Sequence, residues 1–202
     1  MKILVISLVC AWLFADLSRG ESLSRRERDV AMSHLHATRK QLLDAIAGLT
    51  PAQWTYKPAP DRWSAGEIAE HLTETEDFVF KHVTGPILKQ PPGPRADKPE
   101  SRDQWIIEVV PDRSRKAQAP EPVRPSGRWP AREAVEAEFK ARRDRSIKYI
   151  ETAGEDLRGH AGKHPALGEL DAYQWFLFLA AHTDRHVRQL LEVKADAAFP
   201  RR

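Results

Sequence analysis

Cysteine is almost absent from this chain, and its scarcity limits the chemistry that the protein can use. The single cysteine among the 202 residues is Cys10, in the apolar stretch Ile3–Phe14. One thiol cannot form a disulfide within the chain. If residues 1–20 are removed, the remaining domain has no thiolate to bind a metal or to act as a nucleophile. A metal site in that domain must then use histidine, aspartate or glutamate.

The chain also has few long hydrophobic runs. Ile3–Phe14 spans about twelve residues, whereas a membrane-spanning helix needs about 20. A short apolar segment behind Lys2 and ahead of the small residues Ser18 and Gly20 is typical of a secretory signal peptide. We therefore predict a signal peptide at residues 1–20, cut after Gly20, and an exported (periplasmic or extracellular) protein without a stable membrane span after its removal. An uncleaved anchor is the alternative.

A large excess of charge of one sign is missing as well. Lysine and arginine number 32 and aspartate and glutamate 29, so the formal net charge is only +3. Nucleic-acid-binding domains usually carry a clustered basic surface. The composition therefore predicts no nucleic-acid partner, and a small-molecule substrate is the more natural expectation.

The sequence is rich in amphipathic helical segments, the first of which follows residue 24. Ser24 and Glu27 have the spacing of a capping box, and Gly48 followed by Pro51 ends the segment. Its apolar positions recur at helical spacing: Ala31, Leu35, Thr38, Leu42, Ala45, Ile46 and Leu49. His34 and His36 are two residues apart and cannot share a face, so we expect both at the surface or rim. Residues 50–63 should form a Pro-rich loop, a hydrophobic plug over the bundle end or a lid beside a pocket.

A second helix is predicted to begin after Ser64, which forms a capping box with Glu67. Trp63 before the cap can pack on Ile68, which fixes how the helix begins and places His71 two turns into it. We interpret Glu67 as a cap and not as a ligand. Glu74, one turn from His71, could orient the second ring nitrogen of that histidine. Glu70, Glu76 and Asp77 are expected on the solvated side of the helix. His82 is nearly three turns from His71 and is expected outside any site.

Residues 85–130 contain ten of the fifteen prolines and predict a long crossing connection. Within it, Ser101–Val110 could be a short helix or an added strand that docks through Trp105, Ile106 and Ile107. Pro130 suits the first position of a third helix. The inner face of that helix is expected at Val135, Phe139, Ser146, Tyr149 and Ile150, and Gly154 should end it.

Residues 159–167 are expected to form a loop with solvated His160 and His164, and a last helix should run from about Gly168 to Lys194. Four amphipathic helices, one long crossover and no strand-rich region predict an all-α four-helix bundle. The bundle should occupy residues 22–196 as one domain, with the crossover at 85–130 between the second and third helices.

Two histidines interrupt the apolar face of the last helix. His182 and His186 are four residues apart, so their side chains lie one turn apart on the same face of the helix. The same face also carries the apolar residues Phe176, Leu179, Leu190 and Val193. His71 has a similar setting on the second helix. Three neutral imidazoles with one open position form a catalytic zinc-type site, which lowers the pKa of bound water to about 7 or polarises a carbonyl. The alternative is two core-edge histidines hydrogen-bonded to neighbours.

Two segments carry a family resemblance: RWSAGEIAEHL at 62–72 and HPALGELDAYQWFLFLAAHTDRHVRQLLEVK at 164–194. In order and separation they resemble the DinB-like (YfiT-like) superfamily. The resemblance implies a four-helix bundle with a divalent metal, commonly zinc or nickel, held by His71, His182 and His186. Relatives include transferases and isomerases that use thiols such as bacillithiol or mycothiol, so the resemblance implies a thiol-dependent enzyme; a hydrolase would instead use a metal-bound hydroxide.

The resemblance leaves the reaction open. We predict an enzyme whose metal activates water or a substrate thiol, with no carboxylate assignable as general base. An export signal departs from the many cytosolic relatives, and low-molecular-weight thiols are scarce outside the cytosol. One alternative is a non-catalytic bundle that binds a metal or small ligand in the cell envelope, and another is a plain interaction domain. Related bundles often form homodimers, but no pairing face is visible in the sequence.

Overall fold

A computed structural model describes residues 22–97, 99–114 and 118–201. The predicted signal peptide at 1–20 lies outside these described residues. None of the helices in the described part combines the length and the apolar character that a membrane crossing requires.

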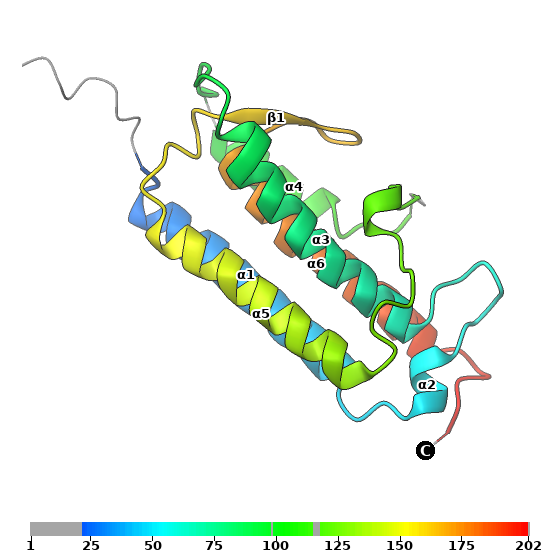
Figure 1. The fold of residues 1–202 in the computed structure, drawn as a ribbon. Coiled ribbons are helices and arrows are strands. Elements are labelled where there is room, and N and C mark those ends of the chain that lie inside the picture. Colours follow the sequence, from blue (N-terminus) through cyan, green and yellow to red (C-terminus); the bar gives the residue numbers. More distant parts are fainter. Residues whose placement is uncertain (1–21, 98, 115–117, 202) are drawn as a thin grey trace, which may run out of the picture.

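Four long helices form the bundle that the sequence predicts (Figure 1). They are α1 (Arg25–Ile46), α3 (Ala65–His82), α5 (Arg132–Thr152) and α6 (Ala172–Lys194). Helices α1 and α3 each pack against both α5 and α6, so that α1 faces α3 across the bundle. The predicted all-α four-helix bundle is therefore confirmed.

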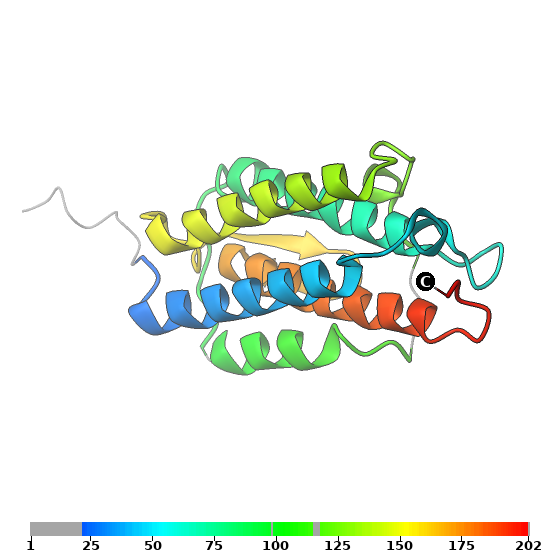
Figure 2. The same ribbon diagram turned by 90° about the horizontal axis from the view of Figure 1, so that it is seen from below.

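The crossover between α3 and α5 contains a helix of its own. Helix α4 (Pro99–Val109) packs along the outside of α6, as Figure 2 shows from below. Ile106 is fully buried there, and Trp105 and Ile107 pack partly buried against the same core. The short-helix alternative is thus correct and the added strand is wrong. Two shorter segments flank the helix: the π-helix Val83–Ile87 and the 3-10 turn Glu121–Val123.

A β-hairpin occupies the region where a loop and the start of the last helix were expected. Strands β1 (Ala161–His164) and β2 (Gly168–Asp171) pair antiparallel, and Gly168 has φ +77°. Helix α6 begins only at Ala172, because the Asp171 side chain accepts a hydrogen bond from Gln174 N at 2.7 Å. This capping box stops the helix from extending back to Gly168, so the predicted start was wrong.

The expected loop at 50–63 begins with the short helix α2 (Pro51–Thr55). Thr50 and Gln53 form a further capping box, which explains why these residues turn into a helix. Trp54 is buried, so the prediction of a hydrophobic plug is confirmed for this part. A Cβ at Gly66 would lie 2.7 Å from Trp54 Nε1, so only glycine lets α3 approach the ring.

Helix α5 begins two residues later than predicted. Pro130 lies outside it, because Ala131 is extended (φ −91°, ψ 133°) and serves as the N-cap without a side-chain hydrogen bond. The expected inner face is correct: Val135, Phe139, Ser146 and Ile150 are buried, and Tyr149 is partly buried.

A buried ion pair lies where the four helices meet. Arg143 Nε of α5 donates to Glu76 Oε1 of α3 at 2.8 Å, and both side chains have no exposed surface. The same guanidinium donates to Thr38 Oγ1 of α1 at 2.8 Å and to Thr183 Oγ1 of α6 at 2.7 Å. Glu76 is therefore not a solvated residue, which corrects the sequence interpretation.

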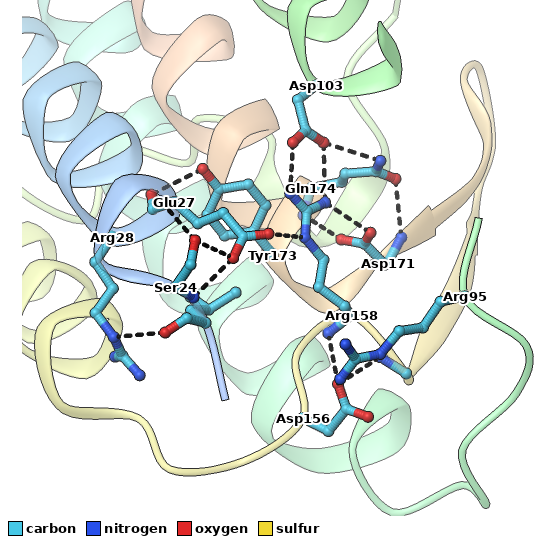
Figure 3. Close-up of polar contacts among 12 residues, drawn as sticks. Ser24, Glu27, Arg28, Arg95, Asp103, Asp156, Arg158, Asp171, Tyr173 and Gln174 are labelled. Carbon is cyan, nitrogen blue, oxygen red and sulfur yellow. Dashed lines mark hydrogen bonds and ion pairs between the residues drawn. The ribbon is translucent and has the colours of Figure 1, made fainter. Parts of the chain in front are cut away.

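A second charged cluster, centred on Arg158, fixes the start of α6 (Figure 3). Arg158 contacts Glu27 of α1 at 2.8 Å, Asp103 of α4 at 2.5 Å and Asp171 at 2.9 Å. Tyr173 donates from its hydroxyl to Glu27 O at 2.8 Å. The cluster joins α1, α4 and the end of the hairpin, and so fixes the start of α6 against α1 and α4.

Candidate metal centre

The structure brings His71, His182 and His186 together. Nε2 of His182 lies 3.4 Å from Nε2 of His71 and 3.1 Å from Nε2 of His186. One ring nitrogen from each of the three residues lies within 4.8 Å of the other two. The sequence therefore predicted which histidines meet, one from α3 and two from α6.

Local structure explains why His71 reaches this point. Ser64 Oγ accepts from Glu67 N at 3.2 Å, and Glu67 Oε2 accepts from Ser64 N at 2.8 Å. This capping box fixes the first turn of α3, as expected. Glu67 also pairs with Lys57 at 2.6 Å, which agrees with its interpretation as a cap and not as a ligand.

The outer nitrogens of two of these rings are held by acceptors. His71 Nδ1 lies 2.7 Å from Val123 O, and His186 Nδ1 lies 2.8 Å from Gln189 Oε1. Gln189 Oε1 also accepts from Arg113 Nη1 at 3.2 Å, which identifies that atom as the oxygen. Since both acceptors lack hydrogens, both Nδ1 atoms carry the proton, and both Nε2 lone pairs face the cluster.

Glu74 does not orient His71, contrary to the sequence interpretation. Its carboxylate pairs with Arg128 at 3.0 Å and with Arg142 at 3.2 Å. The actual partner, the Val123 carbonyl, is 52 residues away in sequence. No local pattern links the two positions, because the path of the crossover decides their contact.

The arrangement of donors fits a divalent cation. A neutral His182 carries one proton and can satisfy only one of the two lone pairs that face its Nε2. Its buried Nδ1 has no hydrogen-bond partner among the described residues. Tetrahedral ligands about 2.0–2.1 Å from zinc lie roughly 3.3 Å apart, close to the 3.1 Å and 3.4 Å found here. A cation among the three rings would satisfy all three lone pairs.

Burial keeps the three rings neutral. It lowers the pKa of His71 to about 4, although the Val123 hydrogen bond acts in the opposite direction. Burial also holds the pKa values of His182 and His186 well below the usual range, and the neighbouring imidazoles lower them further. All three histidines are therefore in the form that binds a metal at neutral pH.

Aromatic rings surround the three imidazoles. The centroid of Trp63 lies 4.9 Å from that of His71 and 6.1 Å from that of His186, on which it stacks. Phe178 packs on His182 with the centroids 5.2 Å apart. Trp63, from the loop before α3, is only partly buried. It therefore covers the site from the side of that loop, while Phe178 limits water on the side of His182.

The remaining histidines lie outside the cluster. His36 is exposed and His34 partly exposed on α1, as predicted. His82 lies apart from the site, also as predicted, and packs against Trp175 with the centroids 4.9 Å apart.

His160 and His164 were expected in solvent, and both are partly buried instead. The ring of His164 packs 4.5 Å from Phe178 and 5.1 Å from Trp175, and burial lowers its pKa to about 4. The hairpin causes this difference, since it folds β1 over the start of α6.

Glu70 is a residue near the site whose role the sequence did not indicate. Its carboxylate is buried and accepts from Ser126 N at 2.9 Å, Ser126 Oγ at 3.1 Å, Gly127 N at 3.0 Å and Arg128 N at 3.1 Å. Burial alone would raise the pKa of Glu70, but these hydrogen bonds outweigh it and keep the pKa below its usual value. The expectation of a solvated carboxylate was therefore wrong.

Comparisons with known proteins agree with the fold. The protein YuaE of Bacillus subtilis (strain 168), which is uncharacterized, is 25% identical over 163 residues, covering 81% of this chain and 96% of YuaE. The solved structure of YfiT from Bacillus subtilis, described as a probable metal-dependent hydrolase with an unusual four-helix bundle topology, matches with a TM-score of 0.52. That match covers 93% of this chain and 97% of YfiT at 13% identity, and so supports the fold alone.

The family assignment covers most of the chain, including all three clustered histidines. Residues 34–190 match the family model described as the DinB superfamily. The chain therefore belongs to the DinB superfamily.

Proposed function

We propose that the protein is a metal-dependent hydrolase of small molecules, with a divalent ion, zinc or nickel, held by His71, His182 and His186. The observation that carries the proposal is the convergence of three neutral imidazoles, two of which have their outer nitrogens fixed as donors. When bound, the ion would supply Lewis acidity toward a water, a thiol or a carbonyl. The description of YfiT as a probable metal-dependent hydrolase supports the same class.

The residues of the chain have separate tasks in this proposal. Val123 and Gln189 keep the Nε2 lone pairs of His71 and His186 directed inward. Trp63 and Phe178 lower the polarity around the rings, which strengthens electrostatic interactions there. Three protein ligands leave a coordination position for water or substrate.

Elemental analysis of the purified protein tests the metal. We expect about one zinc or nickel ion per chain in the wild type and a large loss in His71→Ala, His182→Ala and His186→Ala. His36→Ala, which removes an exposed ring, is the matched control and should keep the ion. If the wild type and His182→Ala contain equally little metal, the site does not exist as proposed.

Substrate screens test the reaction. The metal-loaded wild type should hydrolyse members of an ester and amide panel, whereas His182→Ala should not. A parallel thiol-conjugation screen distinguishes S-transfer, and turnover there alone would replace the hydrolase by a transferase. A metal-loaded protein inactive in both screens would instead be a binding protein.

The location of the protein is a separate proposal. The apolar segment Ile3–Phe14 supports export with cleavage after Gly20. Fractionation of the native host and N-terminal sequencing of the mature protein test this, and a chain that begins at Met1 in the cytosol would contradict it.

A further inference from the structure

We propose that Glu70 is a positioning residue for the metal centre. Its carboxylate holds the crossover turn at residues 123–128 so that the Val123 carbonyl accepts the proton of His71 Nδ1. The inference rests on the proposed function, because it concerns how one of the proposed ligands is oriented.

The contact between Glu70 and the turn has the form of an anion site made of backbone. The N–H groups of three consecutive residues, Ser126, Gly127 and Arg128, all donate to its two oxygens, and the Ser126 hydroxyl adds a fourth bond. Gly127 has φ +76°, a conformation that favours glycine. Successive N–H groups that converge in this way bind anions strongly, and bonds to an ionised acceptor are about twice as strong as neutral ones.

Several contacts hold the turn, and Glu70 supplies four hydrogen bonds between it and α3, beside the ion pair of Arg128 with Glu74 at 3.0 Å. Val123 ends a single 3-10 turn, Glu121–Val123, whose closing bond is that of Arg124 N to Glu121 O at 3.1 Å. Val123 itself is buried. Glu70 and His71 are adjacent on α3 and contact the crossover at two points three residues apart. Glu70 binds Ser126, and His71 binds the Val123 carbonyl. The position of the carbonyl that meets His71 therefore depends on the Glu70 contact.

The position of the Val123 carbonyl decides which tautomer His71 adopts. A neutral imidazole carries its proton on either nitrogen, and an acceptor at Nδ1 stabilises the form with a free Nε2 lone pair. Without that acceptor, the form with a proton on Nε2 competes, and that proton occupies the place of the metal. Loss of such an outer partner typically weakens metal binding by 10–100-fold.

The coupling must be reciprocal. If the Glu70 contact increases metal affinity by some factor, metal binding stabilises the Glu70 contact by the same factor. Metal binding to the wild type should therefore slow hydrogen exchange at the amides of Ser126, Gly127 and Arg128.

Glu70→Gln is the decisive variant. It keeps the size of the side chain but places an NH₂ group against an N–H donor of the turn. Glu74→Gln is the matched control, since Glu74 lies one turn further on α3 and binds only the side chain of Arg128 in this turn. Two quantities are measured: cobalt(II) or zinc affinity by chelator competition, and the His71 tautomer in the metal-free protein by long-range ¹H–¹⁵N NMR.

We expect Glu70→Gln to bind metal about tenfold or more weakly and to gain the tautomer protonated at Nε2. Glu74→Gln should stay within about threefold of the wild type, as expected for a partly exposed ion pair. Wild-type affinity and tautomer in Glu70→Gln, or an equal loss in Glu74→Gln, would overturn the inference.

The tautomer separates this inference from the proposed function. If the wild type binds no metal but Glu70→Gln still changes the His71 tautomer, the proposed function fails and the positioning role stands. If Glu70→Gln does not fold, Ser126→Ala removes one of the four bonds and should shift the tautomer in the same direction to a smaller degree. An unchanged tautomer in that variant contradicts the role of the turn.

Discussion

Glu76 and Arg143 carry opposite charges in the interior of the bundle, where neither side chain is exposed. Hydrogen bonds from Arg143 offset the cost of burying the two charges. They go to the Leu35 carbonyl at 2.9 Å and to the hydroxyls of Thr38 in α1 and Thr183 in α6. Loss of one buried partner leaves the other charge unpaired, whereas replacement of both by apolar residues is often neutral or stabilising. The two charges are therefore interdependent.

We expect Glu76→Leu to lower the free energy of unfolding by about 3–5 kcal/mol, because it leaves the Arg143 guanidinium buried without a carboxylate. The double variant Glu76→Leu/Arg143→Met should recover most of this loss. Urea unfolding followed by circular dichroism measures both. A single variant that costs under about 1 kcal/mol would show that water reaches Arg143.

At the same scale, the sequence identified the three clustered histidines but misjudged the acidic residues beside them. The spacing of His182 and His186 is a local property of one helix, and so it was visible in the sequence. Glu70 and Glu76 were placed in solvent, because helical periodicity assigns a face but does not show what covers it. A crossover turn covers Glu70, and α5 covers Glu76.

Short elements differ most from the sequence interpretation. The capping boxes at Ser24 and Ser64 precede long periodic segments and were recognised. The equivalent boxes at Thr50 and Asp171 were missed, because α2 is only five residues long and the hairpin ends directly at α6. Four-residue strands offer too few alternations to be distinguished from a loop.

The hairpin gives the metal-free protein a pH-dependent stability through His164. Its Nδ1 accepts from Ala166 N at 3.2 Å and Leu167 N at 3.1 Å, and burial lowers its pKa to about 4. The unfolded chain has an ordinary imidazole pKa of about 6.5. Between these values the unfolded chain binds a proton that the folded protein does not, so stability decreases as the pH falls from about 6.5 to 4.

We expect His164→Leu to reduce the slope of the free energy of unfolding against pH, by at most the contribution of one bound proton. Urea midpoints at pH 7.5, 6 and 5, measured with a chelator present, give the slopes for wild type and variant. The comparison concerns the slopes and not the absolute stabilities, since the substitution also changes packing between Trp175 and Phe178. Coincident slopes would mean that His164 is protonated freely in the folded protein.

For the molecule as a whole, the metal centre joins parts that are distant in sequence. His71 belongs to α3, His182 and His186 belong to α6, and the crossover supplies Val123 and Arg113 around them. An ion bound at this point connects three parts of the fold that the unfolded chain does not hold together. Metal binding should therefore stabilise the whole domain.

We expect a chelator to lower the melting temperature of the metal-loaded protein by roughly 5–10 °C. Ligand at 100 times its dissociation constant stabilises by about 2.7 kcal/mol, and 1 kcal/mol shifts the melting temperature of a domain of this size by about 2–4 °C. Scanning calorimetry with and without zinc measures the shift. His182→Ala should melt at the same temperature in both conditions, and an equal shift in that variant would assign the effect to another site.

The sequence by itself determined the four long helices, the capped starts of α1 and α3, and which three histidines meet. The helices, their caps and the pairing of His182 with His186 follow from periodicity and spacing, which act over one or two turns of helix, whereas the place of His71 beside that pair followed from the resemblance of two segments to the DinB-like superfamily. Only the tertiary structure decided what surrounds those histidines. The His71–Val123 and Glu70–Ser126 contacts join residues 52 and 56 positions apart. The path of the crossover over α3 and α6 creates them, and that path depends on the packing of the whole bundle.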